Sequence, residues 1–155
     1  MIHVVLVEPE IPANTGNIAR TCLATGARLH LVKPLGFSID DKQLRRAGLD
    51  YWQDVDVHVW EDLEALTASQ PADARRFYLT TKSRQPYWDA AFQDGDWLYF
   101  GRETRGLPEP LLAASPESCL TIPMLQGSTR SLNLSVSVGI VLYDALRQTG
   151  FNTAR

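Results

Sequence analysis

The stretch IHVVLVEPEIPANTGNIARTCLATGARLHLV, residues 2–32 of the 155-residue chain, decides the fold. It opens with an apolar run of strand length, and RLHLV at 28–32 is a second such run. Residues 14–25 between them are predicted to form a helix, with Asn14 as its N-cap and Gly26 as its stop signal. The pattern predicts a strand, a helix and a second strand, the unit that joins two parallel strands.

Strands and helices continue to alternate beyond this unit. Apolar runs predict strands near residues 55–60, 76–81, 96–101 and 119–124, and helices are predicted after Asp41, from Glu61 and after Pro108. Such alternation predicts an α/β fold, with a mostly parallel sheet that carries helices on both faces. Because no repeat, low-complexity tract or long linker divides the sequence, we expect a single domain over residues 1–155.

Residues 127–148, GSTRSLNLSVSVGIVLYDALRQ, show both a period-two pattern and a helical one. Sixteen residues, 133–148, are long for a strand and ordinary for a helix. Asn133 offers an N-cap oxygen and Arg147 suits a helix C-terminus, so a helix is predicted. The small residues that would let a neighbouring sheet or partner subunit approach closely are Ser135, Ser137 and Gly139.

Composition narrows the class of protein. The longest apolar run, near residues 136–146, is too short to cross a bilayer, so a cytoplasmic protein is expected. Cys22 and Cys119 belong to no C-x-x-C pair and are predicted to be buried, inert thiols. The three histidines fit no metal-binding pattern, so no metal is expected.

The formal net charge of −3 argues against a general nucleic-acid binder, yet the cations are clustered. Residues 20–46 carry six cations against two acids, whereas residues 47–75 carry seven acids against one cation. The sequence therefore allows a basic face that attracts phosphate. An ordinary solvated face, whose charges group only in sequence, remains the alternative.

Four loops that follow predicted strands are rich in Gly, Pro, Asn and Ser, and ligands of parallel α/β proteins gather at that edge. These loops are EPEIPANTGNIAR (8–20), LTTKS (79–83), FGRETRGLP (100–108) and IPMLQGSTRS (122–131). Gly101 and Gly106 have the spacing of a P-loop, but the required Lys-Ser/Thr pair is missing. From the residues alone, Asn14 can be a plain helix cap, Arg20 a surface cation and Glu103 one side of an ion pair.

Three segments that include parts of these loops resemble, in order, the three motifs of the SPOUT class of RNA 2'-O-methyltransferases. They are NTGNIARTC, FGRETRGLP and IPMLQGSTRSLNLSVSVGIVLYDALR. The chain also looks like one branch of that class, TrmL, in three segments: EPEIPANTGNIARTC, LHLVKPLGFSIDDKQLRRAGLDYW and LTTKS. The resemblance covers about residues 2–150. It implies transfer of a methyl group from S-adenosylmethionine to the ribose 2'-hydroxyl of the wobble cytidine or uridine in the anticodon arm of tRNA, with leucine tRNAs as the expected substrates.

The resemblance also implies a C-terminal deep trefoil knot and a homodimer with active sites at its interface. The positions that it places around the cofactor are Leu79, Gly101, Ile122, Ser131 and Leu132. The catalytic positions that it implies are Asn14, Arg20, Glu103 and Asn133. Because an arginine stays protonated, we expect Arg20 to act electrostatically, by holding a phosphate and stabilising charge on the 2'-oxygen.

The basic run supplies candidates for contacts with tRNA phosphates: Lys33, Lys42, Arg45, Arg46 and Arg130. Tyr51 and Trp52 are possible base-stacking groups, with a structural aromatic pair as the alternative. Two other functions stay open from the sequence. One is 2'-O-methylation of another RNA such as ribosomal RNA, and the other is a nonenzymatic nucleotide-binding or RNA-binding module.

Overall fold

Six parallel strands form one sheet in the order β3-β2-β1-β5-β4-β6. The structure is a computed structural model that describes residues 1–153, apart from the side chains of residues 48–51. The strands are β1 (His3–Val7), β2 (Arg28–Val32), β3 (Val57–Trp60), β4 (Arg76–Leu79), β5 (Trp97–Phe100) and β6 (Cys119–Leu120).

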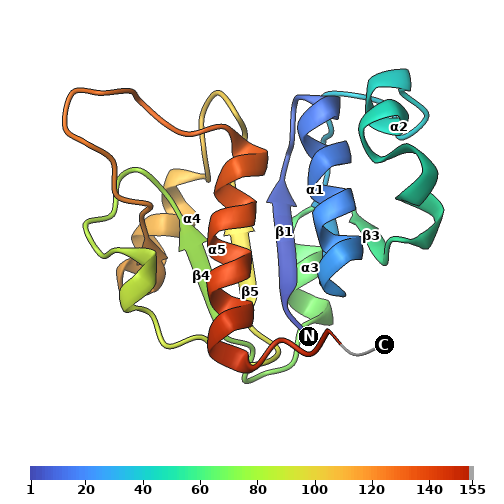
Figure 1. The fold of residues 1–155 in the computed structure, drawn as a ribbon. Helices are drawn as coiled ribbons and strands as arrows, with labels where there is room; N and C mark the ends of the chain where they lie inside the picture. The colour runs from blue at the N-terminus through green and yellow to red at the C-terminus, as the bar shows by residue number, and fades with distance from the viewer. Residues whose placement is uncertain (154–155) are drawn as a thin grey trace.

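Helices cover both faces of this sheet. Helices α1 (Pro12–Thr25) and α5 (Leu134–Thr149) lie side by side on one face, and α3 (Leu63–Ser69) and α4 (Glu109–Ala114) lie on the other (Figure 1). Helix α2 (Lys42–Gly48) and the 3₁₀ turn Leu49–Asp54 pack beside α1. Two further 3₁₀ turns span Tyr87–Asp89 and Pro116–Ser118. The predicted α/β class, with a parallel sheet between helices, is confirmed.

The strands are apolar throughout because both faces of the sheet are buried. Along β1, Val4 and Leu6 face the layer of α1 and α5, whereas Val5 and Val7 face the layer of α3 and α4. All four of these side chains are at most 2% exposed. Side chains of a strand alternate between its two faces, so one short run supplies both halves of the core.

Helix α1 begins earlier than predicted, and Asn14 is not its N-cap. The N-cap is Ile11, whose side chain makes no capping hydrogen bond, and Pro12 occupies the first helical position. Proline suits that position because its φ is preset and its missing N–H would be unpaired there in any case. The predicted end of the helix is confirmed, since Gly26 adopts the left-handed conformation with φ 75°.

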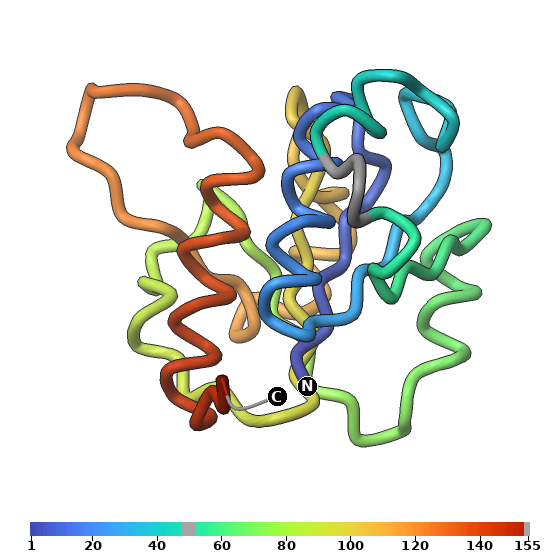
Figure 2. The backbone as a smooth tube through the Cα atoms, turned by 45° about the vertical axis from the view of Figure 1, so that its right-hand side comes forward, coloured from blue at the N-terminus to red at the C-terminus, as the bar shows by residue number. Residues whose placement is uncertain are grey.

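Strand β6 is shorter than the predicted apolar run at 119–124. After Leu120 the chain leaves β4, and Thr121 pairs with the segment before the Tyr87–Asp89 turn. The N–H of Thr121 donates to the carbonyl oxygen of Gln85 at 2.8 Å, and the N–H of Tyr87 donates to the carbonyl oxygen of Thr121 at 2.8 Å. The following loop, 121–133, extends away from the rest of the fold before α5 begins (Figure 2).

The ambiguous C-terminal stretch is a helix, as predicted. Asn133 is the N-cap of α5, and its Oδ1 accepts hydrogen bonds from the N–H groups of Ser135 (2.8 Å) and Val136 (3.3 Å).

The two cysteines, Cys22 and Cys119, are buried and form no disulfide, as predicted, and burial raises the pKa of Cys22 to about 12. Among the described residues, no helix has the length and apolar character needed to cross a membrane.

Candidate functional site

A pocket of about 580 Å³ opens at the carboxyl ends of β4 and β5, beside the first turns of α1 and α5. This is the edge where ligands of parallel α/β proteins gather. All five residues predicted around the cofactor line it: Leu79, Gly101, Ile122, Ser131 and Leu132. Four further predicted site residues also line it, namely Asn14, Glu103, Arg130 and Asn133.

The loop after β5 is closed at its base by a tight backbone contact. Arg102 and Gly106 exchange two backbone hydrogen bonds, of 3.2 and 2.8 Å, and Gly106 has φ +68°. A Cβ at Gly101 would lie 2.0 Å from the carbonyl carbon of Gly106 and 2.1 Å from the nitrogen of Leu107. Gly101 is therefore required for the close approach of two backbone segments.

Glu103 ties this loop to the start of α1. Its carboxylate accepts hydrogen bonds from the N–H groups of Glu10 (2.9 Å) and Ile11 (2.8 Å) and from the Nδ2 of Asn14 (3.2 Å). The first N–H groups of a helix lack partners within the helix, and negative charge is favoured at that end. Glu103 thus holds, from a distant loop, the two residues before the helix and the side chain of Asn14 in its first turn.

Asn14 links this carboxylate to the second helix of the pocket. It is 6% exposed, and its Oδ1 accepts a hydrogen bond of 3.1 Å from the Nδ2 of Asn133. Its Nδ2 donates to Glu103, so both ends of its amide are used. Glu103, Asn14 and Asn133 therefore form one continuous network that fixes the starts of α1 and α5 relative to the loop after β5.

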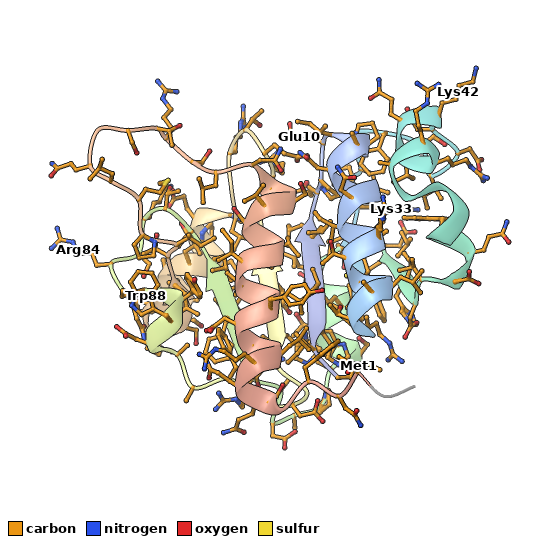
Figure 3. All side chains as sticks on the ribbon, viewed as in Figure 1. Met1, Glu10, Lys33, Lys42, Arg84 and Trp88 are labelled. Carbon is orange, nitrogen blue, oxygen red and sulfur yellow. The ribbon has the colours of Figure 1, made fainter. Side chains whose placement is uncertain are left out.

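Sequence reasoning missed Glu10, whose side chain accepts hydrogen bonds from the loop after β5, just as Glu103 of that loop accepts hydrogen bonds from the segment at the start of α1. Its Oε1 accepts hydrogen bonds from the N–H (3.0 Å) and the Oγ1 (2.7 Å) of Thr104, and these bonds lower the pKa of Glu10. Glu10 lies at the start of α1, toward the pocket loop (Figure 3). The only signal in the sequence was the pair of acids in EPEIP, which does not reveal a partner ninety-four residues away.

Arg20 does not line this pocket within a single chain. It lies on the exposed side of α1, six residues after Asn14, which corresponds to about 9 Å along the helix. The predicted catalytic set therefore divides into three residues that are joined at the pocket and one arginine that lies farther along α1.

The predicted phosphate-binding residues also divide. Arg130 lines the pocket, but the other four lie on the far side of α1 from it, where Figure 3 labels Lys33 and Lys42. Two of these four are paired: Lys33 with Glu61 at 3.1 Å, and Arg45 with Asp40 at 2.9 Å. Lys42 and Arg46 are exposed. Trp52 packs against the core, and the side chain of Tyr51 lies outside the described residues.

The remaining lining shows what kind of group the pocket suits. Apolar side chains, among them Leu79, Ile122 and Met124, line the pocket together with the hydroxyl-bearing residues Thr80 and Ser131. Along residues 122–133 of the described chain, one backbone N–H makes a hydrogen bond, that of Ser128 to Leu125. Most amides of this segment are thus available to a ligand with both apolar and polar parts. The described residues contain no group of three side chains suited to a metal ion.

Comparison with known proteins gives consistent matches. The SpoU rRNA Methylase family matches residues 1–143. A Burkholderia pseudomallei protein named tRNA (cytidine(34)-2'-O)-methyltransferase is 51% identical over 153 residues, which are 97% of this chain and 97% of that protein. A Yersinia pestis protein of the same name is 50% identical over 156 residues, covering 97% of this chain and 96% of its own length.

Solved structures agree in fold. One described as "Structural insights into the 2-OH methylation of C/U34 on tRNA" has a TM-score of 0.91 at 47% identity, over 96% of this chain and 95% of that one. An AdoMet-bound rRNA methyltransferase from Sinorhizobium meliloti has a TM-score of 0.83 at 26% identity, over 94% of this chain and 56% of that one.

Proposed function

The chain belongs to the SpoU rRNA Methylase family and is a methyltransferase, and we propose that it methylates the ribose 2'-hydroxyl of the wobble nucleotide, position 34, of tRNA. The observation that carries this proposal is the joined network of Glu103, Asn14 and Asn133 at the mouth of the pocket. Relatives of about half identity over nearly their whole length bear the name of this activity. We further propose leucine tRNAs as substrates, and one catalytic domain that acts in the cytoplasm.

S-adenosylmethionine is the proposed methyl donor, and the residues present fit it. A volume of about 580 Å³ lies within the range of roughly 300–1,000 Å³ typical of small-molecule sites. Apolar side chains such as Leu79 and Ile122 suit the adenine ring of the donor. The backbone N–H groups of residues 122–133 that have no backbone partner suit the polar groups of the donor. When bound, the donor supplies an electrophilic methyl group on a sulfonium centre.

The protein's task is then to position the 2'-oxygen and to help its proton leave. The reacting oxygen and carbon must be held about 3–3.5 Å apart. Arg20 cannot serve as a base because its guanidinium stays protonated, so it stabilises negative charge as that charge develops on the oxygen. Glu103 is a positioning residue, since both of its carboxylate oxygens already accept hydrogen bonds. A substrate phosphate oxygen or water accepts the proton.

We propose a homodimer whose active sites lie at the interface, formed through the outer face of α1 and α5. Support comes from two apolar side chains on α5, Val136 and Tyr143, which are each 51% exposed and seven residues apart. Residues spaced by seven lie on one side of a helix. Arg20 lies on the exposed side of the neighbouring α1, so dimerisation through this face would bring a second subunit close to it.

A C-terminal trefoil knot is also proposed. The connection from β4 to β5 runs along α5, because the N–H of Phe92 donates to the Oε1 of Gln148 at 2.9 Å. Ala90 and Phe92 also share a core cluster with α5. In the proposed knot the chain after β6 passes through a loop of the fold before it forms α5, and the contacts of residues 90–92 with α5 support this by placing the two segments together.

The proposed activity is tested with bulk tRNA that lacks the wobble modification. The protein is incubated with S-adenosylmethionine labelled in its methyl group, and the labelled nucleoside is then mapped. Label as a 2'-O-methyl group at position 34 is expected. Label in ribosomal RNA alone would instead favour the other methyltransferase function, and a failure of the donor to bind in equilibrium dialysis would favour the nonenzymatic module.

A further inference from the structure

The pocket that holds the proposed active site is lined by cations on several sides. Lys82, Arg102, Arg105 and Arg130 all line it, from three different loops. Among the described lining residues, the carboxylate is that of Glu103, which accepts three hydrogen bonds from the start of α1. The rim of the pocket is thus more positive than the overall net charge of −3 suggests.

The three arginines of this rim are not neutralised by ion pairs. The ion pairs of the described residues include Lys82 with Glu109, but none that involves Arg102, Arg105 or Arg130. Glu10 is the acid near the loop. Its Oε1 accepts two hydrogen bonds from Thr104, and Arg102 and Arg105 act on it through their charge alone, which helps to lower the pKa of Glu10. Two cations of the basic region predicted from the sequence, Lys33 and Arg45, are by contrast paired with acids.

Two of these arginines stand on a loop that is held from both sides. Glu103 and Thr104, the residues between them, are anchored to the segment before α1 by five hydrogen bonds, counting the bond from Asn14. The bridge between Arg102 and Gly106 closes the base of the loop. The backbone from which Arg102 and Arg105 project is therefore fixed before a ligand arrives, which reduces the entropy lost on binding.

The cationic part of the lining, unlike the apolar part assigned to the donor, favours an RNA phosphate over the wobble base. A guanidinium group presents paired N–H donors that match phosphate oxygens. The aromatic side chain in the described lining is Phe100, which is 2% exposed and cannot present a face for base stacking. Sequence-specific reading of a single-stranded base depends on such stacking and on contacts to base edges.

We infer that Arg102, Arg105 and Arg130 clamp the phosphates on either side of the methylated ribose, so that this pocket reads the RNA backbone and not the wobble base. The inference rests on the proposed function. It assigns Arg102 and Arg105 to substrate binding, beside Arg130, which the sequence already predicted to contact tRNA phosphates. It also explains how one pocket can accept either cytidine or uridine. Phosphate contacts position a nucleic acid without carrying sequence information.

The test compares anticodon stem-loops that differ only in a cytidine or uridine at the wobble position. Arg102→Gln, Arg105→Gln and Arg130→Gln are each measured for RNA affinity over a range of salt concentrations. Each should weaken binding about 10-fold or more at low salt, by the same factor for both stem-loops. The slope of log K against log salt should become shallower by about 0.7 for each phosphate that the protein no longer neutralises. Affinity for S-adenosylmethionine should be unchanged.

Arg28→Gln is the matched control, because Arg28 begins β2 at the opposite edge of the sheet and pairs with Asp56. It should keep wild-type RNA affinity and salt slope. Unchanged binding in the three rim variants would overturn the inference, as would a loss confined to one base or a loss of donor affinity. If the wild type binds both stem-loops and methylates neither, the proposed function fails, while a uniform loss in the variants would still support the clamp.

Discussion

The side-chain amides of Asn14 and Asn133 meet at 3.1 Å, although 119 positions separate them in the sequence. This contact joins the first turn of α1 to the N-cap of α5, and Glu103 extends it to the loop after β5. Three of the four loops that face the pocket are therefore coupled by one polar network. Asn14, the buried member, bonds to both of the others, and a polar network whose members are all satisfied holds a single geometry.

Asn14→Asp should break the network more severely than removal of the side chain. The new carboxylate would face Glu103 at a position that is 6% exposed, and the donor to Glu103 would be lost. We expect a loss of about 2–4 kcal/mol in the free energy of unfolding, measured in urea, with activity lost in parallel. Asn17→Asp, on the exposed side of the same helix, is the control and should be near wild type. Equal stability of Asn14→Asp and Asn14→Ala would contradict the expected repulsion between the new carboxylate and Glu103.

Gly101→Ala should distort the pocket loop. Its Cβ would lie 2.0 Å from the carbonyl carbon of Gly106, so the backbone must move. Donor binding in equilibrium dialysis should be abolished or greatly weakened. Gly106→Ala is the matched control in the same loop, because a Cβ at Gly106 would meet open space. Gly106 has a positive φ, so this variant should lose only about 1–2 kcal/mol in the free energy of unfolding. Wild-type donor affinity in Gly101→Ala would contradict the assignment of this loop to the donor site.

The order of strands and helices was predictable because it depends on local apolar runs and on glycine at a helix end. The start of α1 was not, since the two residues before the helix, Glu10 and Ile11, are held by Glu103, which lies far away in the sequence. A local rule searches for a side-chain cap and selects Asn14, whose amide is instead used between two other elements. The length of β6 escaped prediction for a similar reason, because Thr121 pairs with a distant segment.

The site was predictable to the extent that its residues belong to recognisable motifs. The structure gathers Asn14, Glu103 and Asn133 at the pocket, but charge clustering in the sequence favoured α2 as the basic surface. Summed charge in a segment takes no account of ion pairs formed on folding, such as that of Arg45 with Asp40. The sequence indicates Arg102 and Arg105 only as ion-pair partners of Glu103, whereas in the structure Glu103 and Thr104 bond to Glu10 before α1.

Arg20→Ala should reduce the rate of methyl transfer by about 100-fold or more while donor affinity stays near wild type. The reason is that Arg20 is proposed to act on charge that develops in the transition state, and it does not line the donor pocket of its own chain. Single-turnover rates and equilibrium dialysis separate the two effects. A collapse of donor affinity as large as the loss of rate would show that Arg20 has a structural role.

Tyr143→Glu should convert the proposed dimer into a monomer. It would replace one of the two exposed apolar side chains of α5 with a charge, since Tyr143 is 51% exposed in the single chain. Trp88→Glu is a suitable control, because Trp88 is an exposed aromatic residue outside α1 and α5. Sedimentation measures the oligomeric state of both variants. A wild-type protein that sediments as a monomer would contradict the dimer itself.

Stability should fall in acid because of a pair of histidines, the buried His30 and the half-buried His3. The Nε1 of Trp60 donates to the Nδ1 of His30 at 3.0 Å, and the Nε2 of His30 lies 3.0 Å from the Nδ1 of His3, so both rings are neutral. Burial lowers the pKa of His30 to about 3 and that of His3 to about 4. Since these values lie below those of the unfolded chain, the stabilisation is complete above pH of about 6.5 and is lost as the pH falls toward about 3.

Urea unfolding between neutral pH and pH 4 measures this loss, with a slope of up to about 1.4 kcal/mol per pH unit for each proton taken up. His30→Gln should flatten the slope, because it removes the ring that is only 2% exposed. An unchanged slope in His30→Gln would assign the acid sensitivity to other groups.

The most direct measurement compares two anticodon stem-loops that differ by a single oxygen atom. One carries ribose at position 34 and the other 2'-deoxyribose, and both are incubated with the protein and methyl-labelled S-adenosylmethionine. We predict that the ribose form gains one methyl group at that nucleotide, and that the deoxy form binds but gains none. Equal labelling of the two stem-loops, or labelling of neither by a protein that binds both RNA and donor, would contradict methylation of the wobble 2'-hydroxyl.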